Sequence, residues 1–310
     1  MIPAVHTHCP RCGSTLMEQP GARELGETAD RYQDCKYVCT SCSIGLSNAK
    51  LQPTFIRGNW RDGLWRRSTA ARLERLLDQA LSEITREKKR RRLANERSED
   101  LLTWNVFSWL ETRHLLGRVI RWLGLPEPSD TPAIYYWGAT DRPAAGVDLR
   151  DLLTRHFSEA TNSLSEPDVI LVGQASVVFI EAKFASPNDR QIGTSKADKY
   201  IERARGWFLD NAEAVRQSGY YELTRNWAIG GVLAEQLGKR FALMNLVRRG
   251  DEGKVPEAFA PLLSNKGVFA VRSWEDLVSE IEPALLAHLQ DETLYFESAF
   301  PSLMTSPPAD

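Results

Sequence analysis

Two short apolar runs constrain the fold of this chain more than any other feature. They are VILV at residues 169–172 and VVFI at 177–180, and four residues, GQAS, separate them. Neither run alternates polar with apolar residues, so each predicts a strand that is buried on both faces. We therefore predict an antiparallel hairpin at the centre of a sheet, with strands over 168–172 and 177–184.

The four-residue connection sets the register of this hairpin. It pairs Val172 with Val177, and four residues further out Asp168 lies opposite Glu181. Directly paired residues share a face of the sheet, with Cβ atoms about 4.5–5.5 Å apart. Lys183 follows Glu181 by two residues and faces the same way. The spacing therefore predicts that Asp168, Glu181 and Lys183 converge.

Two carboxylates opposite one another destabilise a sheet unless something compensates their charge. A divalent cation between Asp168 and Glu181 would do so, because hard cations prefer carboxylate oxygens. The alternative is an ion pair between Lys183 and one of the acids at the sheet margin. Because charges at the ends of buried strands are costly, we expect a site here.

The five cysteines all lie in the first 42 residues. Four of them form two C-x2-C pairs, CPRC and CTSC, which suit the corners of a tetrahedral zinc site; they are Cys9, Cys12, Cys39 and Cys42. Disulfides are the alternative, and a cytosolic setting disfavours them. Cys35, His6 and His8 could each replace a ligand, but the paired cysteines are the simpler set.

Charge is unevenly distributed along the 310 residues. Residues 57–97 carry 13 Lys and Arg against 6 Asp and Glu, which indicates either a polyanion contact or a solvated helix face. No apolar run reaches the ~18 residues that span a bilayer. The first residues lack the pattern of a secretory signal. We expect a cytoplasmic protein with no membrane partner.

The remaining pattern predicts an alternation of helices and strands. Helical spacing covers 69–94, a helix begins after the N-cap Ser98 and ends before Gly124, and a strand covers 133–138. Further elements are predicted as a short helix at 149–157, helices at 194–217 and 220–237, a strand at 241–247 and a helix at 273–289.

Pro167-Asp168, twelve residues, and then Glu181-Ala182-Lys183 resemble the motif of the PD-(D/E)XK nuclease superfamily. The resemblance implies an α/β fold with a restriction-endonuclease-like α-β-β-β-α-β core, and the predicted elements follow that order with added helices. The cysteine-rich start resembles a small zinc ribbon. The expected domains are a ribbon at 1–50, a linker and basic helix at 51–97, the nuclease-like domain at 98–300 and a disordered tail at 301–310.

The resemblance also implies functional roles. Asp168, Glu181 and the backbone carbonyl of Ala182 would bind catalytic Mg²⁺ or Mn²⁺, and Lys183 would act on the attacking water. A further acid is expected from the first core helix, where Glu99 is the candidate, because residues 102, 103, 106 and 110 on its face indicate that this face turns inward. The alternative for Glu99 is a favourable charge at the helix N-terminus.

The expected activity is metal-dependent endonuclease cleavage of nucleic acid, with DNA as the favoured substrate and restriction or defence as a setting. Lys196, Lys199 and Arg203 lie along one side of a helix and are candidate contacts to phosphates, or simply a solvated face. A double-strand cut needs two active sites, which would suit a homodimer. The alternatives are a catalytically inactive nucleic-acid-binding protein and a zinc-ribbon interaction adaptor.

Overall fold

The computed structural model describes residues 8–27, 29, 31–49, 53–184, 195–209, 212–253 and 255–281. The chain divides into two compact units. The first contains the described residues of Met1–Leu73 and Glu87–Asn105, and the second those of Glu74–Arg86 and Val106–Pro283. The predicted tail at 301–310 and the end of the predicted last helix, 282–289, lie outside the described residues. The predicted boundaries at residues 50 and 97 stay predictions.

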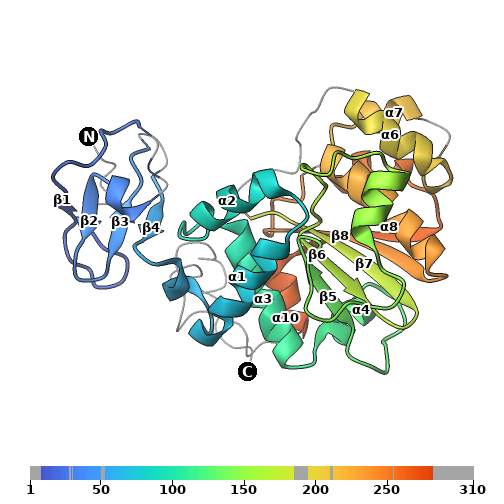
Figure 1. Ribbon diagram of the computed structural model, residues 1–310, viewed down its shortest axis with the longest axis horizontal. Helices are drawn as coiled ribbons and strands as arrows, with labels where there is room; N and C mark the ends of the chain where they lie inside the picture. Colours follow the sequence, from blue (N-terminus) through green and yellow to red (C-terminus); the bar gives the residue numbers. More distant parts are fainter. Residues whose placement is uncertain are drawn as a thin grey trace. The chain divides into compact units, whose positions relative to one another are not determined.

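The first unit contains a small antiparallel sheet (Figure 1). Its strands lie in chain order: β1 (Met17–Glu18), β2 (Tyr37–Cys39), β3 (Ile44–Leu46) and β4 (Phe55–Arg57). The described residues of this unit also form the 3-10 turns η2 (Tyr32–Asp34), η3 (Trp60–Gly63) and η4 (Arg67–Thr69). Each strand is only two or three residues long, so this sheet cannot bury a sizeable core by itself.

The predicted helix over 69–94 is wrong as a single element, because the chain forms α1 (Ala70–Gln79) and α2 (Glu83–Arg92). The break follows from a tertiary contact. The Ser82 N–H donates to Glu166 Oε1 at 2.7 Å, and the Ser82 hydroxyl accepts the N–H of Thr85 at 3.4 Å. Ser82 thus caps a new helix instead of continuing the old one.

Ser98 is confirmed as an N-cap, since its hydroxyl accepts the N–H of Leu101 at 3.2 Å. The helix that follows is also divided, into α3 (Glu99–Thr112) and α4 (Leu116–Trp122). His114 between them has φ +58°, a left-handed conformation that ends α3. The division was not predicted, because no glycine or proline marks residue 114.

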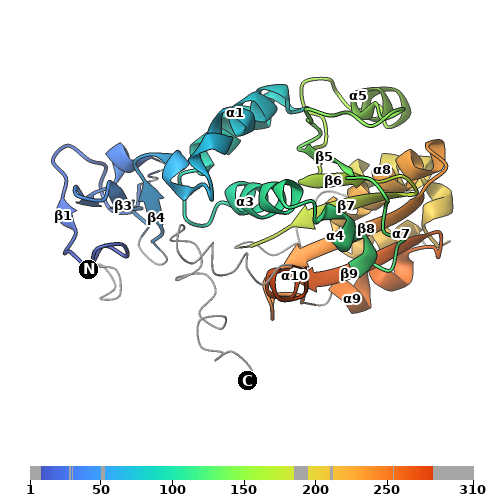
Figure 2. The same ribbon diagram turned by 90° about the horizontal axis from the view of Figure 1, so that it is seen from below.

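The second unit is built on a five-stranded mixed sheet, and Figure 2 shows its strands side by side. In order they are β5 (Ala133–Tyr136), β6 (Val169–Val172), β7 (Ser176–Ala182), β8 (Arg240–Val247) and β9 (Gly267–Ser273). The first three run antiparallel to one another, while β8 and β9 run parallel to β7. The strands predicted at 133–138 and 241–247 are therefore confirmed, whereas β9 was not predicted.

The central hairpin has the predicted register. Val172 pairs with Val177, and Val169 pairs with Ile180. Every residue of β6 and β7 is buried, which confirms the prediction drawn from the lack of alternation. Because consecutive residues of a strand point to opposite faces, the burial of every residue shows that both faces of β6 and β7 lie inside the fold.

The helices of the second unit follow a less regular course than predicted. They are α5 (Leu149–Asp151), the π-type turn η5 (Leu152–His156), α6 (Ser195–Arg203), the turn η6 (Arg205–Trp207), α7 (Ala212–Gln217), α8 (Tyr221–Gln236), α9 (Val255–Ala258), the turn η7 (Ala260–Leu262) and α10 (Trp274–Ile281). The predicted helix at 194–217 is thus wrong as one piece. The Trp207 carbonyl instead accepts the Trp227 indole at 2.6 Å and the Ser264 N–H at 3.0 Å.

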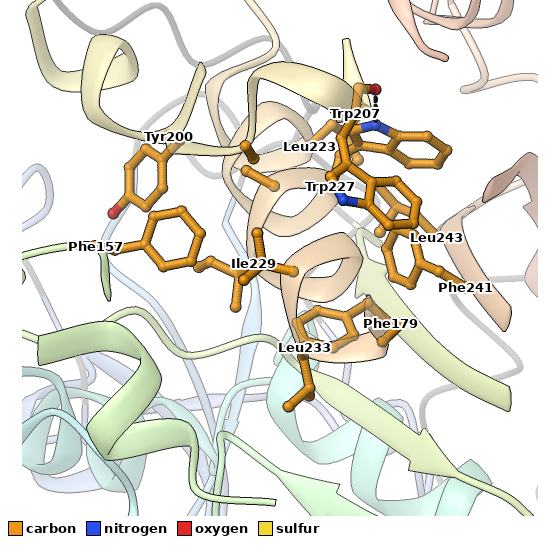
Figure 3. Packing of buried hydrophobic residues seen from close by; sticks show 14 of the residues in the cluster. Phe157, Phe179, Tyr200, Trp207, Leu223, Trp227, Ile229, Leu233, Phe241 and Leu243 are labelled. Atoms are coloured by element: carbon orange, nitrogen blue, oxygen red, sulfur yellow. Dashed lines mark hydrogen bonds between the residues drawn. The ribbon is translucent and has the colours of Figure 1, made fainter. Parts of the chain in front are cut away.

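Helix α8 packs directly on β7 and β8 (Figure 3). The rings of Trp207, Trp227 and Phe241 meet at 5.2–6.0 Å between centroids. Gly230 allows this close approach, since a Cβ there would lie 2.2 Å from Phe241 and 3.0 Å from Phe179. A glycine inside a helix costs about 1 kcal/mol relative to alanine, and here it brings α8 against the sheet.

Gly230→Ala is therefore expected to destabilise the protein by about 1–3 kcal/mol, because the added methyl group overpacks the core. Chemical denaturation followed by tryptophan fluorescence measures the change. Gly238→Ala is not a suitable control, as its φ of +63° brings strain of its own. Ala228→Gly, at a buried position two residues earlier in α8, controls for helix propensity. Equal stability of Gly230→Ala and wild type would contradict the packing argument.

Candidate active site and cysteine cluster

The β6–β7 ladder ends at the pair Val169–Ile180, and the next residues in the same register are Asp168 and Glu181. Asp168 directly precedes β6, and its carbonyl accepts the Trp137 N–H at 3.3 Å, which extends the pairing with β5. Its carboxylate Oδ2 accepts the backbone N–H of Ala182 at 2.9 Å. Asp168 thus bonds to β7 through its side chain where the backbone pairing of β6 ends.

Glu181 is a buried carboxylate, only 3% exposed. Its Oε1 lies 2.6 Å from Lys183 Nζ, and its Oε2 accepts the side-chain amide of Asn226 at 2.6 Å. Burial raises the pKa of Glu181 above the usual carboxyl range; the charge of Lys183 opposes this shift and that of Glu222 adds to it. Of the three side chains predicted to converge, Glu181 and Lys183 are in direct contact, while the Asp168 carboxylate bonds to the backbone of the neighbouring Ala182.

Lys183 is held in place although it follows the last residue of β7. Its N–H donates to the Leu246 carbonyl at 2.7 Å, and its own carbonyl accepts the Trp274 indole at 2.9 Å. Its ammonium bridges two carboxylates, Glu181 at 2.6 Å and Glu222 at 2.8 Å. The backbone is anchored on both sides, so the ammonium group has a defined position.

Helix α8 contributes three charged or polar groups that sequence reasoning missed. These are Glu222, Arg225 and Asn226. Burial lowers the pKa of Arg225, but the charges of Glu181 and Glu222 outweigh burial and hold it above its usual value. The sequence offered one indication, since a fully buried Asn226 stands in the otherwise apolar run NWAIGGV. Buried amides need a partner, and here it is Glu181.

Glu99 lies at the start of α3, and the residues predicted to share its inward face are buried. Leu102, Thr103, Val106 and Leu110 are each exposed by 1% or less. Glu99 belongs to the first unit, whereas the hairpin belongs to the second. Its membership of the site therefore stays a prediction.

The basic residues of α6 differ in their surroundings. Lys196 is exposed, while Lys199 is half-buried, with Nζ 4.8 Å from the centre of the Tyr200 ring. Burial lowers the pKa of Lys199, and the charge of Glu159 opposes that shift. Arg203 donates to the carbonyl of His156. Lys199 and Arg203 thus have partners inside the protein, and their contact with nucleic acid stays a prediction.

Part of the basic segment also has internal partners. Lys89 forms an ion pair with Asp100 at 2.8 Å within the first unit. Helix α2 presents positive charge to the solvent through three exposed side chains, those of Lys88, Arg91 and Arg92.

The four paired cysteines form a compact cluster. All their sulfur atoms lie within 4.8 Å of one another, and Cys12 Sγ lies 3.7 Å from Cys39 Sγ. Four sulfurs at ~2.3 Å from a tetrahedral zinc are about 3.8 Å apart, so the geometry fits this metal. Among the described residues, this is the only group of three or more Cys, His, Asp or Glu side chains gathered so closely.

The thiols of this cluster differ in acidity. A hydrogen bond with Ser14 lowers the pKa of Cys12 to about 6, whereas the hydrogen bond with Cys12 raises the pKa of Cys42 to about 12. Burial raises the pKa of Cys9. Zinc binds thiolates, so a bound ion would replace these thiol–thiol contacts.

Cys35 lies outside the cluster. It is fully buried, its thiol contacts the Arg31 carbonyl at 3.4 Å, and a Cβ at Gly45 would lie 2.6 Å from its sulfur. Burial raises its pKa to about 12, which keeps it a neutral core side chain. His8 pairs with Thr15 in a backbone bridge, and His6 lies outside the described residues.

The two cysteine pairs share one turn geometry. Gly13 after the first pair has φ +71°, and Ser43, which replaces the usual glycine after the second, has φ +52°. This conformation costs a non-glycine residue about 1–2 kcal/mol. The Gly58 N–H donates to the Ser43 carbonyl at 2.7 Å and helps to hold the turn.

Ser43→Gly is expected to stabilise the first unit by about 1 kcal/mol, because glycine adopts positive φ without strain. Titration of the zinc-loaded protein with denaturant measures the gain. Ser47→Gly, at a position without positive φ, is the control and should be destabilising. A lower stability of Ser43→Gly would contradict the assignment of strain to this turn.

Together these features define a mixed α/β protein with two sheets and a four-cysteine cluster suited to zinc at its N-terminal end. No family model, curated protein or solved structure matches the chain. Within the described ranges, no helix combines the length and apolar composition required to cross a bilayer.

Proposed function

We propose that this protein is a Mg²⁺- or Mn²⁺-dependent nuclease of the PD-(D/E)XK type that hydrolyses phosphodiester bonds of DNA. One observation carries the proposal: the buried Glu181 lies 2.6 Å from the ammonium group of Lys183, one residue beyond the Val169–Ile180 pair, where the hairpin register continues to Asp168. The element order supports it, since α3, β5, β6, β7, α6 and β8 follow the α-β-β-β-α-β order of that superfamily. In this assignment α8 and β9 are additions to the core.

In the proposed site, Asp168, Glu181 and the Ala182 carbonyl would hold the metal ion. When bound, the ion would supply charge stabilisation at the scissile phosphate and would lower the pKa of a bound water. Lys183 positions or deprotonates the attacking water, or neutralises the transition state, roles that suit a lysine in a desolvated site. Its bridge to Glu222 keeps Nζ beside the carboxylates.

The test is a cleavage assay on plasmid, single-stranded DNA and RNA, with zinc-loaded protein freed of other metals. Cleavage that depends on added Mg²⁺ or Mn²⁺ is the expected result. Binding without cleavage under all conditions would instead support an inactive nucleic-acid-binding protein. Absence of both binding and cleavage would support an interaction adaptor, in which the Lys183–Glu181 pair is only structural.

We further propose that Cys9, Cys12, Cys39 and Cys42 hold a structural zinc ion. The short strands of the first sheet provide little core, and in such domains the binding free energy of the metal contributes directly to folding. A homodimer remains our proposal for double-strand cleavage, because one active site cuts one strand. Sedimentation of the protein on duplex DNA tests it.

A further inference from the structure

Helix α8 and strand β7 face each other residue by residue along the proposed site. Gly230 lies against Phe179, Asn226 donates to Glu181, and Glu222 pairs with Lys183. Each step of four residues back along α8 thus matches a step of two residues forward along β7. The two elements run in opposite directions, and Figure 3 shows α8 over the sheet at Phe179.

The match has a geometric basis. Four residues of α-helix rise about 6.0 Å, and two residues of strand rise about 6.6 Å, so the two rows stay in step over this distance. Gly230 brings α8 close to the sheet at one end of the row. Asn226 and Glu222 then extend toward Glu181 and Lys183 without a change in the helix.

Asn226 is placed to orient Glu181. It is 0% exposed, and its amide donates to Oε2 at 2.6 Å. The amide thereby holds the carboxylate in one rotamer, with Oε1 on the side of Lys183. Hydrogen bonds of this kind fix metal ligands in orientation and tune their affinity.

Glu222 is placed to hold Lys183. The ammonium lies between two carboxylates, at 2.6 Å from Glu181 and 2.8 Å from Glu222. A cation that takes Oε1 of Glu181 competes with Lys183 for that oxygen. Glu222 offers the lysine a second anionic partner at almost the same distance, so the ammonium stays beside the site.

We propose that Asn226 and Glu222 are positioning residues of the metal site. Asn226 orients Glu181 for the metal, and Glu222 retains Lys183 once the metal is bound. This inference rests on the proposed nuclease function, but it makes a separate statement about metal affinity. A purely structural role explains Asn226 and Glu222 less well, because a buried ion pair adds little stability over apolar packing. The contact of α8 with β7 at Phe179 is itself apolar.

Direct Mn²⁺ binding to zinc-loaded protein, followed by the loss of the free-ion electron paramagnetic resonance spectrum, tests the first half. Asn226→Ala is expected to weaken Mn²⁺ binding about 10–100-fold. Asn226→Leu, which keeps the branched shape without the amide, should weaken it similarly. Thr224→Val, at a buried position on the same helix, should bind Mn²⁺ like wild type.

Cleavage kinetics test the second half. Glu222→Gln is expected to bind Mn²⁺ nearly as wild type, to keep its KM for DNA, and to lose about tenfold or more in kcat. Glu235→Gln is the matched control, because Glu235 is an exposed carboxylate of α8 that accepts the Trp207 indole at 3.3 Å. It should leave kcat unchanged.

The outcomes separate the two proposals. If wild type binds Mn²⁺ but never cleaves, the nuclease function fails, and the Asn226 variants still decide whether this residue orients Glu181. Wild-type Mn²⁺ affinity in Asn226→Ala, or an unchanged kcat in Glu222→Gln, overturns the corresponding positioning role. Absence of Mn²⁺ binding by wild type, or loss of the fold in both Asn226 variants, also counts against the inference.

Discussion

Lys183→Ala is expected to lower Mg²⁺-dependent DNA cleavage by a factor of about 10²–10⁴, the usual contribution of a positioned acid–base group. The expected loss follows from the position of the Lys183 side chain. Lys183 Nζ is the cation beside Glu181, and its backbone is anchored by Leu246 and Trp274. Truncation therefore removes the ammonium while the strand keeps its place. Single-turnover cleavage of plasmid DNA at saturating Mg²⁺ measures the effect.

Two further variants sharpen this test. Lys266→Ala removes an exposed lysine of the same unit and should retain wild-type cleavage, which controls for the loss of one positive charge. Asp168→Asn keeps an oxygen that can accept the Ala182 N–H but loses the carboxylate charge needed for the metal. It should melt like wild type and fail to cleave. Full cleavage by Lys183→Ala or Asp168→Asn would overturn the assignment of the active site.

The second large effect concerns zinc. Cys12→Ser is expected to lose the bound metal and to unfold the small sheet of the first unit, because structural zinc contributes on the order of 10–16 kcal/mol in comparable small domains. Atomic absorption should find one zinc per wild-type chain and none in the variant. Circular dichroism and limited proteolysis of residues 8–57 report the loss of structure.

Cys35→Ser provides the matched control. It also removes one of the five thiols, but Cys35 lies outside the four-sulfur cluster and contacts Arg31 and Gly45 instead. We expect one zinc per chain and a modest loss of stability. Loss of zinc in Cys35→Ser with retention in Cys12→Ser would show that the ligand set is wrong.

The elements predicted correctly from sequence are those specified by short-range patterns. The β6–β7 hairpin follows from two apolar runs and a connection of defined length, and α8 and β8 follow from clear periodicity. The predictions that failed concern helices whose ends are set by contacts with residues distant in the sequence. Glu166 accepts a hydrogen bond from Ser82, where the helix predicted over 69–94 divides, and Trp227 and Ser264 both donate to the carbonyl of Trp207 within the helix predicted over 194–217.

Strand β9 was not predicted, although its sequence, GVFAVRS, contains an apolar run, VFAV, as long as those of β6 and β7. It is an edge strand, and most of its residues are only half-buried. The local pattern was therefore present in the sequence and was overlooked.

The sequence by itself determined the cysteine cluster and the register of the hairpin, whose continuation places Asp168 across from Glu181, the partner of Lys183. In both cases short chain segments, two C-x2-C turns and one four-residue connection, specify which side chains come together. Only the tertiary structure decided that Asn226 and Glu222 complete this group. Their position depends on how closely α8 packs on β7 at Gly230, and packing between a helix and a sheet strand that are distant in the chain leaves no fixed spacing in the sequence.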